Sequence, residues 1–234
     1  MKANLCIACL AGLLLAGCKD DFLNVVPETN LSSATFFKSQ SDFTQAVNAA
    51  YVPLRTIVND RAWLLGEMHS DNTYFARNPL FGATEQQEDI ADFAVPTANG
   101  VTSNVHVLNQ YRQDYVIIAR TNQVLTAIDK VEFDADAKSN LRGQALFLRA
   151  YAYFELVRYF GKVPLHLTPA TGREDAALPL AEEADVYAQI VKDLQEAIPL
   201  LPPKSKQEPG RVTSGAARTL LANVYVVQKK WADA

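Results

Sequence analysis

The sequence predicts an all-α protein of stacked helical hairpins, and three observations support this fold class. Apolar residues recur every three or four positions through most of the 234 residues, which is the period of an amphipathic helix. Several of these segments begin at helix-capping residues and end near glycine or proline. Two of them also match each other at a fixed offset, as repeated helical units do.

Five segments have this helical period: 41–59, 104–130, Asp134 or Asp136 to Gly161, about 183–200, and a fifth from Thr213 or Ser214 towards Trp231. The first has a clear start signal, because Ser39 and Ser41 flank its beginning and Asp42 lies in its first turn. The third has a clear stop signal, since Gly161 is followed by Pro164. Local chemistry therefore predicts both the helices and several of their ends.

The third and fifth helices align with each other at an offset of 72 residues. The matching pairs are Gly143 with Gly215, Ala145 with Ala217, Leu148 with Leu220, Ala150 with Ala222, Tyr153 with Tyr225, and Tyr159 with Trp231. This offset is close to twice the period of tetratricopeptide helix pairs, which is about 34 residues. The alignment favours a tetratricopeptide-like stack. Two unrelated amphipathic helices rich in alanine and leucine would also align, so that alternative stays open.

An insertion of about 60–103 separates the first two helices. It has little sustained period and contains many turn-forming residues. A structureless loop of about 40 residues is improbable inside a compact domain. We therefore expect an ordered, loop-rich insertion, with short helices or a small hairpin, that projects from the helical body.

The first 17 residues have the features of a secretory leader. Lys2 precedes an apolar run at 5–15, which is too short to cross a bilayer of about 30 Å as a helix. The sequence Leu15-Ala16-Gly17-Cys18 that follows resembles a bacterial lipobox. This resemblance predicts cleavage after residue 17 and lipidation of Cys18. A plain leader that happens to have cysteine at its junction is the alternative.

Lipidation would anchor the mature chain to a membrane without a spanning helix. Acyl chains such as palmitate contribute about 0.8 kcal/mol for each buried methylene group, and more than one chain gives stable anchoring. Residues 18–40 are then a lipidated tether and extended segment, and 41–234 form the helical-repeat domain. Removal of 1–17 also leaves Cys18 as the only cysteine, so a disulfide framework and a cysteine-rich metal site are not expected.

Composition argues against nucleic-acid binding and gives no sign of catalysis. The chain has 22 basic and 26 acidic residues, whereas a nucleic-acid-binding protein needs a basic surface. Three scattered histidines fit no metal-site or catalytic spacing, so no metal and no cofactor are expected. Carboxylates such as Glu85 and Glu88 could flank a glycosidic bond, but nothing separates them from an ordinary solvated surface.

Several segments together resemble the SusD/RagB family of outer-membrane nutrient-uptake lipoproteins. They are 119–125, 142–165, 186–194, Gly210–Thr213, 216–222 and Lys230–Ala234. The resemblance implies a cell-surface lipoprotein in the outer membrane that captures a nutrient, most often a glycan, and delivers it to a SusC-like TonB-dependent transporter. Such a protein is not an enzyme.

The resemblance also raises the question of length. Family members are typically about twice as long as this sequence, which stops where a tetratricopeptide pair would begin its second helix. We therefore expect a fragment or a truncated reading frame. A natural short form whose last helix is covered by another chain is the alternative.

The insertion contains the residues expected to bind an oligosaccharide or peptide ligand. Sugar rings stack on exposed aromatic side chains, and their hydroxyl groups bond amide and guanidinium groups. The candidate residues are Trp63, Asn72, Tyr74, Arg77 and Asn78. Aromatic residues here could instead attach the insertion to the helices. Arg120 and Asn122 match a family segment, and we interpret them as structural groups that bond a neighbouring loop.

A second function remains open at the level of sequence. A membrane-anchored tetratricopeptide-type scaffold would bind a protein or an extended peptide in its concave groove. Capture of a saccharide together with a large barrel partner would distinguish nutrient uptake from this alternative.

Overall fold

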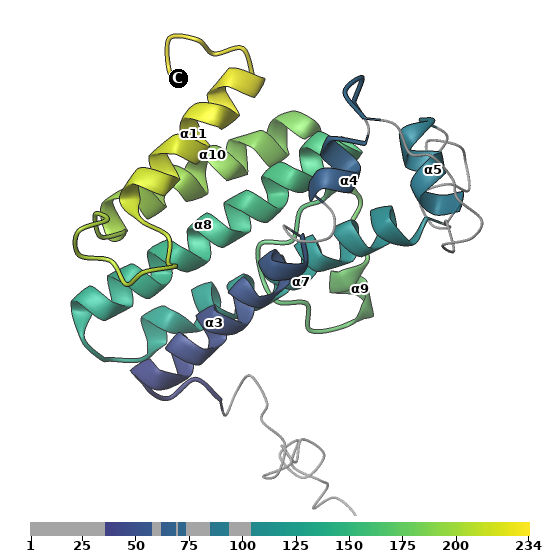
Figure 1. Cartoon of the computed structure of the whole chain (residues 1–234). Helices are drawn as coiled ribbons and strands as arrows, with labels where there is room; N and C mark the ends of the chain where they lie inside the picture. Colours follow the sequence, from purple (N-terminus) through teal and green to yellow (C-terminus); the bar gives the residue numbers. More distant parts are fainter. Residues whose placement is uncertain (1–35, 58–61, 69, 74–84, 94–103) are drawn as a thin grey trace, which may run out of the picture. The chain divides into compact units, whose positions relative to one another are not determined.

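The computed structural model describes residues 36–57, 62–68, 70–73, 85–93 and 104–234. Residues 37–234 form one compact unit. Its long helices are α3 (Gln40–Thr56), α7 (Val105–Ala127), α8 (Ala135–Phe160), α10 (Glu183–Leu200) and α11 (Ser214–Val227) (Figure 1). The short elements are α4 (Ala62–Gly66), α5 (Glu85–Ala91), the 3-10 helix η4 (Ile128–Lys130), β1 (Val163–Pro164), α9 (Arg173–Ala176) and β2 (Leu180–Ala181).

Side-chain caps fix where the long helices begin. The Asp42 carboxylate accepts a hydrogen bond from the Ser39 backbone N–H at 2.8 Å, at the start of α3. The Asp134 carboxylate accepts one from Ala137 N–H at the start of α8, and the Thr213 hydroxyl accepts one from Ala216 N–H at the start of α11. Such caps satisfy donors in the first turn that have no partner within the helix.

The long helices pack against one another in chain order. The successive contacts are α3 with α7, α7 with α8, α8 with α10, and α10 with α11 (Figure 1). Helix α8 also contacts α3 and α11, so neighbours surround it on several sides. Its side chains are accordingly buried around most of its circumference, as expected for the central helix of a stack. This arrangement confirms the predicted all-α, tetratricopeptide-like fold.

A short antiparallel ladder closes the connection between α8 and α10. Val163 pairs with Ala181 and Pro164 pairs with Leu180. Gly161 ends α8 with φ 68, a left-handed conformation that glycine adopts without a steric penalty. The ladder therefore brings the two ends of residues 165–179 together, and α9 lies inside this loop.

The fifth helix ends earlier than its apolar pattern predicted. It stops at Val227, whereas the pattern ran towards Trp231. Lys229 adopts φ 60, and Lys230 N–H then bonds the Tyr225 carbonyl at 2.9 Å. This left-handed residue and backward hydrogen bond are a common way to close a helix. Trp231 consequently lies outside the helix and is 68% exposed.

The described parts of the insertion contain short helices, as expected. Leu64 and Met68, in and just after α4, form a small buried cluster with Ile90 of α5. Helix α5 also contacts α7. No strand occurs among the residues of 60–103 that the structure describes. Across all described residues, no helix is both long enough and apolar enough to cross a bilayer.

Gly143, one residue of the repeat alignment, allows a test of the contact between α8 and the end of α10. A Cβ atom at Gly143 would lie 2.9 Å from Leu201 Cγ and 3.1 Å from Leu200 Cβ, at the end of α10. We expect Gly143→Ala to lower the free energy of unfolding by about 1–3 kcal/mol, because the two helices would have to move apart. Urea denaturation followed by circular dichroism measures the change.

Gly215, the repeat partner of Gly143, provides the matched control. A Cβ atom there would meet only Thr213 Oγ1, at the ordinary distance of 3.7 Å. Gly215→Ala should therefore leave stability unchanged or raise it by about 0.5–1 kcal/mol, since alanine favours helix over glycine. Equal losses in both variants would contradict the close contact at Gly143.

Candidate functional site

The exposed surface of α4 and the turn after it carries two of the five predicted ligand residues. Trp63 on α4 is 49% exposed, and Asn72 in the turn is also exposed. The other three, Tyr74, Arg77 and Asn78, lie outside the described residues, as does Cys18. The structure therefore places an aromatic ring and an amide group in the same short segment, where each is available to a ligand.

The turn that carries Asn72 is organised by the Glu67 backbone carbonyl. This oxygen accepts hydrogen bonds from the Ser70 hydroxyl at 2.6 Å and from the Thr73 hydroxyl. The Ser70 hydroxyl in turn accepts a bond from Asn72 N–H at 3.3 Å. Serine and threonine commonly stabilise turns by such bonds. These bonds use the backbone N–H of Asn72, and the side chain of Asn72 is exposed at the surface.

A second concave feature is a groove of about 300 Å³ between α7 and the loop that follows β1. One wall consists of Tyr115, Ile118, Ala119, Asn122 and Gln123, all on α7. The other wall consists of His166, Thr168, Pro169 and Ala170 of the loop, together with Ala176 of α9. We refer to it as the α7–loop groove.

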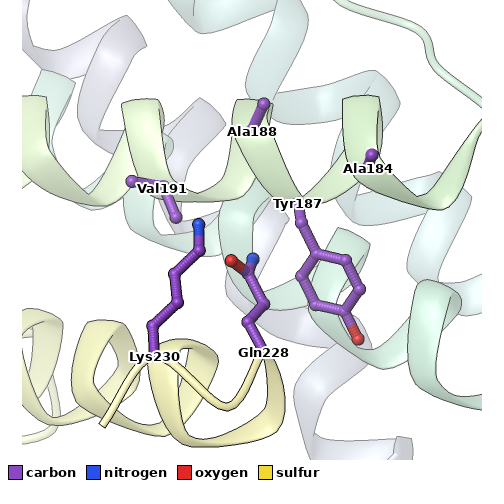
Figure 2. A pocket seen from close by; sticks show the side chains of 6 residues that line it. All are labelled: Ala184, Tyr187, Ala188, Val191, Gln228 and Lys230. Atoms are coloured by element: carbon purple, nitrogen blue, oxygen red, sulfur yellow. The ribbon is translucent and has the colours of Figure 1, made fainter. Parts of the chain in front are cut away.

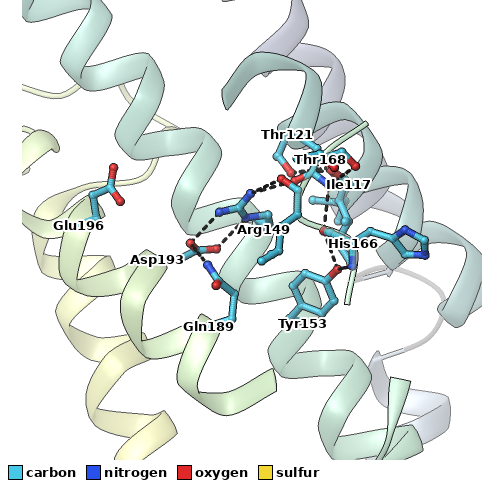
Figure 3. Close-up of polar contacts among 12 residues, drawn as sticks. Ile117, Thr121, Arg149, Tyr153, His166, Thr168, Gln189, Asp193 and Glu196 are labelled. Carbon is cyan, nitrogen blue, oxygen red and sulfur yellow. Dashed lines mark hydrogen bonds and ion pairs between the residues drawn. The ribbon is translucent and has the colours of Figure 1, made fainter. Parts of the chain in front are cut away.

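A buried polar network (Figure 3) reaches this groove through Asn122, which also lines the groove. Arg149 on α8 makes two bonds to the Asp193 carboxylate on α10, at 2.7 and 2.8 Å. Its remaining terminal nitrogen donates to Asn122 Oδ1 on α7 at 2.9 Å. Asp193 also accepts a bond from Gln189 at 2.7 Å. A buried ion pair is tolerated only when its remaining groups are bonded, and here they are.

The same network holds the loop in place. Asn122 Nδ2 donates to the His166 carbonyl at 2.9 Å, and Arg149 donates to the Leu167 carbonyl at 3.3 Å. The Tyr153 hydroxyl donates to the His166 carbonyl and accepts from the His166 backbone N–H, at 2.8 and 2.6 Å (Figure 3). The prediction that Asn122 bonds a neighbouring loop is confirmed.

Arg120 differs from Asn122 in its partner. Its Nη1 donates to the Ala49 carbonyl of α3 at 2.5 Å, so it ties α7 to another helix and not to a loop. The structural role predicted for Arg120 is confirmed, whereas the predicted loop contact is wrong. On α7 this residue lies between the groove-lining Ala119 and the buried Thr121, where it reaches back to α3.

A third concave feature lies between α10 and the end of α11 (Figure 2). Ala184, Tyr187, Ala188 and Val191 of α10 form one side of it. Gln228 and Lys230, which follow α11, extend towards them from the other side (Figure 2). The volume is about 600 Å³, and the two alanines leave this space because they have almost no side chain.

Two buried carboxyl groups lie between α7 and α8. Asp114 is fully buried; Gln110 donates to its Oδ2 at 2.9 Å, while its Oδ1 has no partner within the described residues. Burial raises the pKa of Asp114 well above its usual value, and the nearby Glu155 carboxylate raises it further. Burial likewise raises the pKa of Glu155, although its ion pair with Arg158 opposes this.

Comparison with known proteins gives a consistent family. The profile of the family SusD-like_3, described as "Starch-binding associating with outer membrane", matches residues 21–226. A SusD-like protein of Bacteroides ovatus is 30% identical over 99% of this chain and 40% of its own length. SusD-like protein P2 of Formosa agariphila is 29% identical over 92% of this chain and 41% of its own length. The chain thus spans about 40% of these curated relatives.

Solved structures agree with the sequence relatives. A laminarin-binding SusD-like protein has a TM-score of 0.73 and 26% identity, over 84% of this chain and 42% of its own. A SusD superfamily protein from Bacteroides vulgatus has a TM-score of 0.73 and 26% identity, over 85% of this chain and 42% of its own.

The stack of helices that pack in chain order defines a helical-repeat protein of the tetratricopeptide-like class. The chain belongs to the SusD-like family. This is a family of carbohydrate-binding proteins, so membership confirms the prediction that the chain is not an enzyme.

Sequence reasoning did not find the α7–loop groove or the network behind it. Arg149 and Asp193 lie 44 positions apart and on different helices, so no local spacing connects them. Asn122 was the one visible signal, since an amide in an otherwise apolar helical stripe indicates a partner elsewhere.

The buried carboxyl of Asp114, which has one oxygen without a partner among the described residues, predicts a pH-dependent stability. An unfolded aspartate has a pKa of about 3.9, whereas the folded pKa is raised, so the folded state binds its proton more tightly. Stability should therefore fall as pH rises between the two values, by at most about 1.4 kcal/mol per pH unit. We expect Asp114→Asn, which cannot ionise, to raise the free energy of unfolding at neutral pH relative to the unmodified chain.

Asp193→Asn is the matched control for this measurement. Asp193 is equally buried, but its two oxygens accept bonds from Arg149 and Gln189. Neutralising it leaves the buried Arg149 charge without its partner, and we expect a loss of about 3–5 kcal/mol. Denaturant unfolding between pH 4 and pH 8 measures both variants. Destabilisation by Asp114→Asn similar to that by Asp193→Asn would contradict our interpretation of Asp114.

Proposed function

We propose that this chain is part of a cell-surface lipoprotein that captures a glycan and delivers it to a SusC-type TonB-dependent transporter. The observation that carries the proposal is the fold shared with a laminarin-binding SusD-like protein, with a TM-score of 0.73. The family description, which names starch binding and the outer membrane, supports the same assignment. It also favours a saccharide over the peptide of the scaffold alternative.

The capture site in this proposal includes the exposed residues of the insertion. A half-exposed indole such as that of Trp63 offers a flat apolar face to a sugar ring, and Asn72 adds an amide with donors and an acceptor for hydroxyl groups. Tyr74, Arg77 and Asn78 extend the same chemistry along the sequence. Loops frequently carry binding residues on a rigid scaffold, and here the scaffold is the helical stack.

The attachment and the partner complete the proposal. Lipidation at Cys18 would hold the domain at the membrane through acyl chains. A protein in that position, with a stack of helices exposed to solvent, is suited to cover the mouth of a barrel and to pass ligand into it. The resemblance to the SusD/RagB family supports the pairing with a SusC-like transporter and an orientation towards the cell exterior.

Removal of the Trp63 ring tests the capture site. Trp63→Ala should lower the affinity for a soluble glycan by about tenfold, which corresponds to about 1.4 kcal/mol, because a stacking surface is lost. Isothermal titration with laminarin and with soluble starch measures the affinity. Far-ultraviolet circular dichroism should be unchanged, since Trp63 is half exposed.

Trp231→Ala is the matched control, because Trp231 is another exposed tryptophan on a different part of the chain. Its loss should not change glycan affinity. If the Trp63→Ala and Trp231→Ala variants bind glycan with the same affinity, the proposal of a capture site in the insertion is wrong. If the unmodified chain binds no glycan in a broad panel, glycan capture by this chain is itself wrong.

Replacement of Cys18 tests the anchor and the partner. In a bacterial host that processes lipoproteins, the unmodified chain should incorporate labelled palmitate and sediment with membranes, whereas Cys18→Ser should do neither. Cys9 lies in the leader, so a Cys9→Ser variant should still be lipidated at Cys18 and serves as the control. Affinity purification from solubilised outer membranes should recover a large barrel protein with the lipidated form. Palmitate labelling that persists in Cys18→Ser would contradict lipidation at Cys18. Consistent failure to recover a barrel protein would contradict the transporter partner.

A further inference from the structure

The α7–loop groove has the composition of a ligand site and lies apart from the α4 turn in the sequence. Within the part of the chain that the structure describes, its lining includes no lysine, arginine, aspartate or glutamate. Phosphate and carboxylate ligands are most often held by arginine or lysine, and hard metal ions by several carboxylates, and this lining supplies none of these residues. The occupant that fits is therefore neutral.

Aromatic rings and uncommitted polar groups meet in the groove. The rings of Tyr115 and His166 lie 5.8 Å apart at an interplanar angle of 85°, and both are partly exposed. Among the described residues, neither the Gln123 amide nor the Thr168 hydroxyl has a side-chain hydrogen bond. An amphipathic ligand with apolar faces and hydroxyl edges, such as a sugar ring, matches this combination.

The size of the groove limits the ligand further. Pockets of about 300–1,000 Å³ hold drug-sized molecules, and this groove, at about 300 Å³, is at the lower end of that range. One or two sugar units fit such a volume. A partner helix, with a diameter of about 10 Å including side chains, does not.

The loop wall is held in position before any ligand arrives. Asn122 and Tyr153 bond the backbone of His166, and Arg149 bonds the next carbonyl while it is itself fixed by Asp193. Binding sites require that the contacting residues be held by such a second layer of hydrogen bonds, because a preformed site avoids the entropic cost of ordering. A buried ion pair that supports a surface loop is consistent with this role.

We propose that the α7–loop groove is a second saccharide contact, which takes a neutral sugar unit independently of the α4 turn. The inference rests on the proposed function, because it assumes that this chain binds glycans. It assigns stacking to Tyr115 and His166 and hydroxyl recognition to Gln123 and Thr168.

Nuclear magnetic resonance tests the groove separately from the α4 turn. The probes are laminarihexaose and maltohexaose, and the reporters are the side-chain amide of Gln123 and the ring protons of His166. At least one probe should shift these signals in the unmodified chain and also in Trp63→Ala. Ala119→Trp should abolish the shifts, because Ala119 is exposed on the α7 wall and an indole there would fill the space.

Ala188→Trp is the matched control, since Ala188 is also an exposed helical alanine but lines the groove between α10 and α11. It should leave the Gln123 and His166 shifts intact. If Ala119→Trp fails to fold, Gln123→Ala is used in its place. The saccharide Kd measured from the His166 shifts should then rise by about fivefold, which is the effect of losing one hydrogen bond of about 1 kcal/mol.

The outcomes separate the two proposals. Saccharide shifts confined to the α4 region, with Gln123 and His166 silent, would overturn the second contact and leave glycan capture standing. Silence of both regions towards every saccharide would overturn both. A response of the groove to peptides but not to saccharides would also overturn the inference, in favour of the scaffold alternative.

Discussion

The buried ion pair between Arg149 and Asp193 is the interaction on which the rest of this structure depends. It joins α8 to α10 at the centre of the stack, and through Asn122 it extends to α7. Three helices and one loop thus share one connected set of buried polar groups. Apolar contacts would allow α10 to slide along α8 at modest cost, whereas a two-bond guanidinium–carboxylate contact fixes one register.

The helices surround this centre in a way that explains the composition of α8. The helix has neighbours on several sides, so it cannot keep the polar face of an ordinary surface helix. Gly143 allows the end of α10 to approach, and Tyr153 reaches from the same helix to the loop at His166. Helix α8 therefore provides both the packing surface of the stack and the support for the α7–loop groove.

Much of the fold could be predicted from the sequence because its signals are local. The helix starts capped by Asp42, Asp134 and Thr213 depend on residues within three positions, and the stop at Gly161 depends on one residue. The end of α11 was missed because apolar spacing continues to Trp231, while the left-handed turn at Lys229 has no glycine to reveal it. The tetratricopeptide-like class of the fold was also predictable, because the helical period repeats along the chain.

The candidate site was less predictable because its parts come from distant positions. Residue type alone selected Trp63 and Asn72, and the structure shows both at the surface. The groove, in contrast, needs α7 to meet a loop some 45 residues later in the chain, and that contact is set by Arg149, Asn122 and Tyr153. Hydrophobic periodicity contains no information about such long-range polar bonds.

The two-residue ladder between β1 and β2 has a consequence for how this protein could diversify. Because the pairing of Val163 with Ala181 fixes both ends of the excursion, changes of length after Thr168, beyond the residues bonded to α7 and α8, need not disturb the helices on either side. Relatives could therefore remodel one wall of a cavity by inserting or deleting residues there, while the opposite wall keeps its geometry. The β1–β2 ladder would in this way allow the ligand specificity of the loop to evolve without a change in the helices that determine folding.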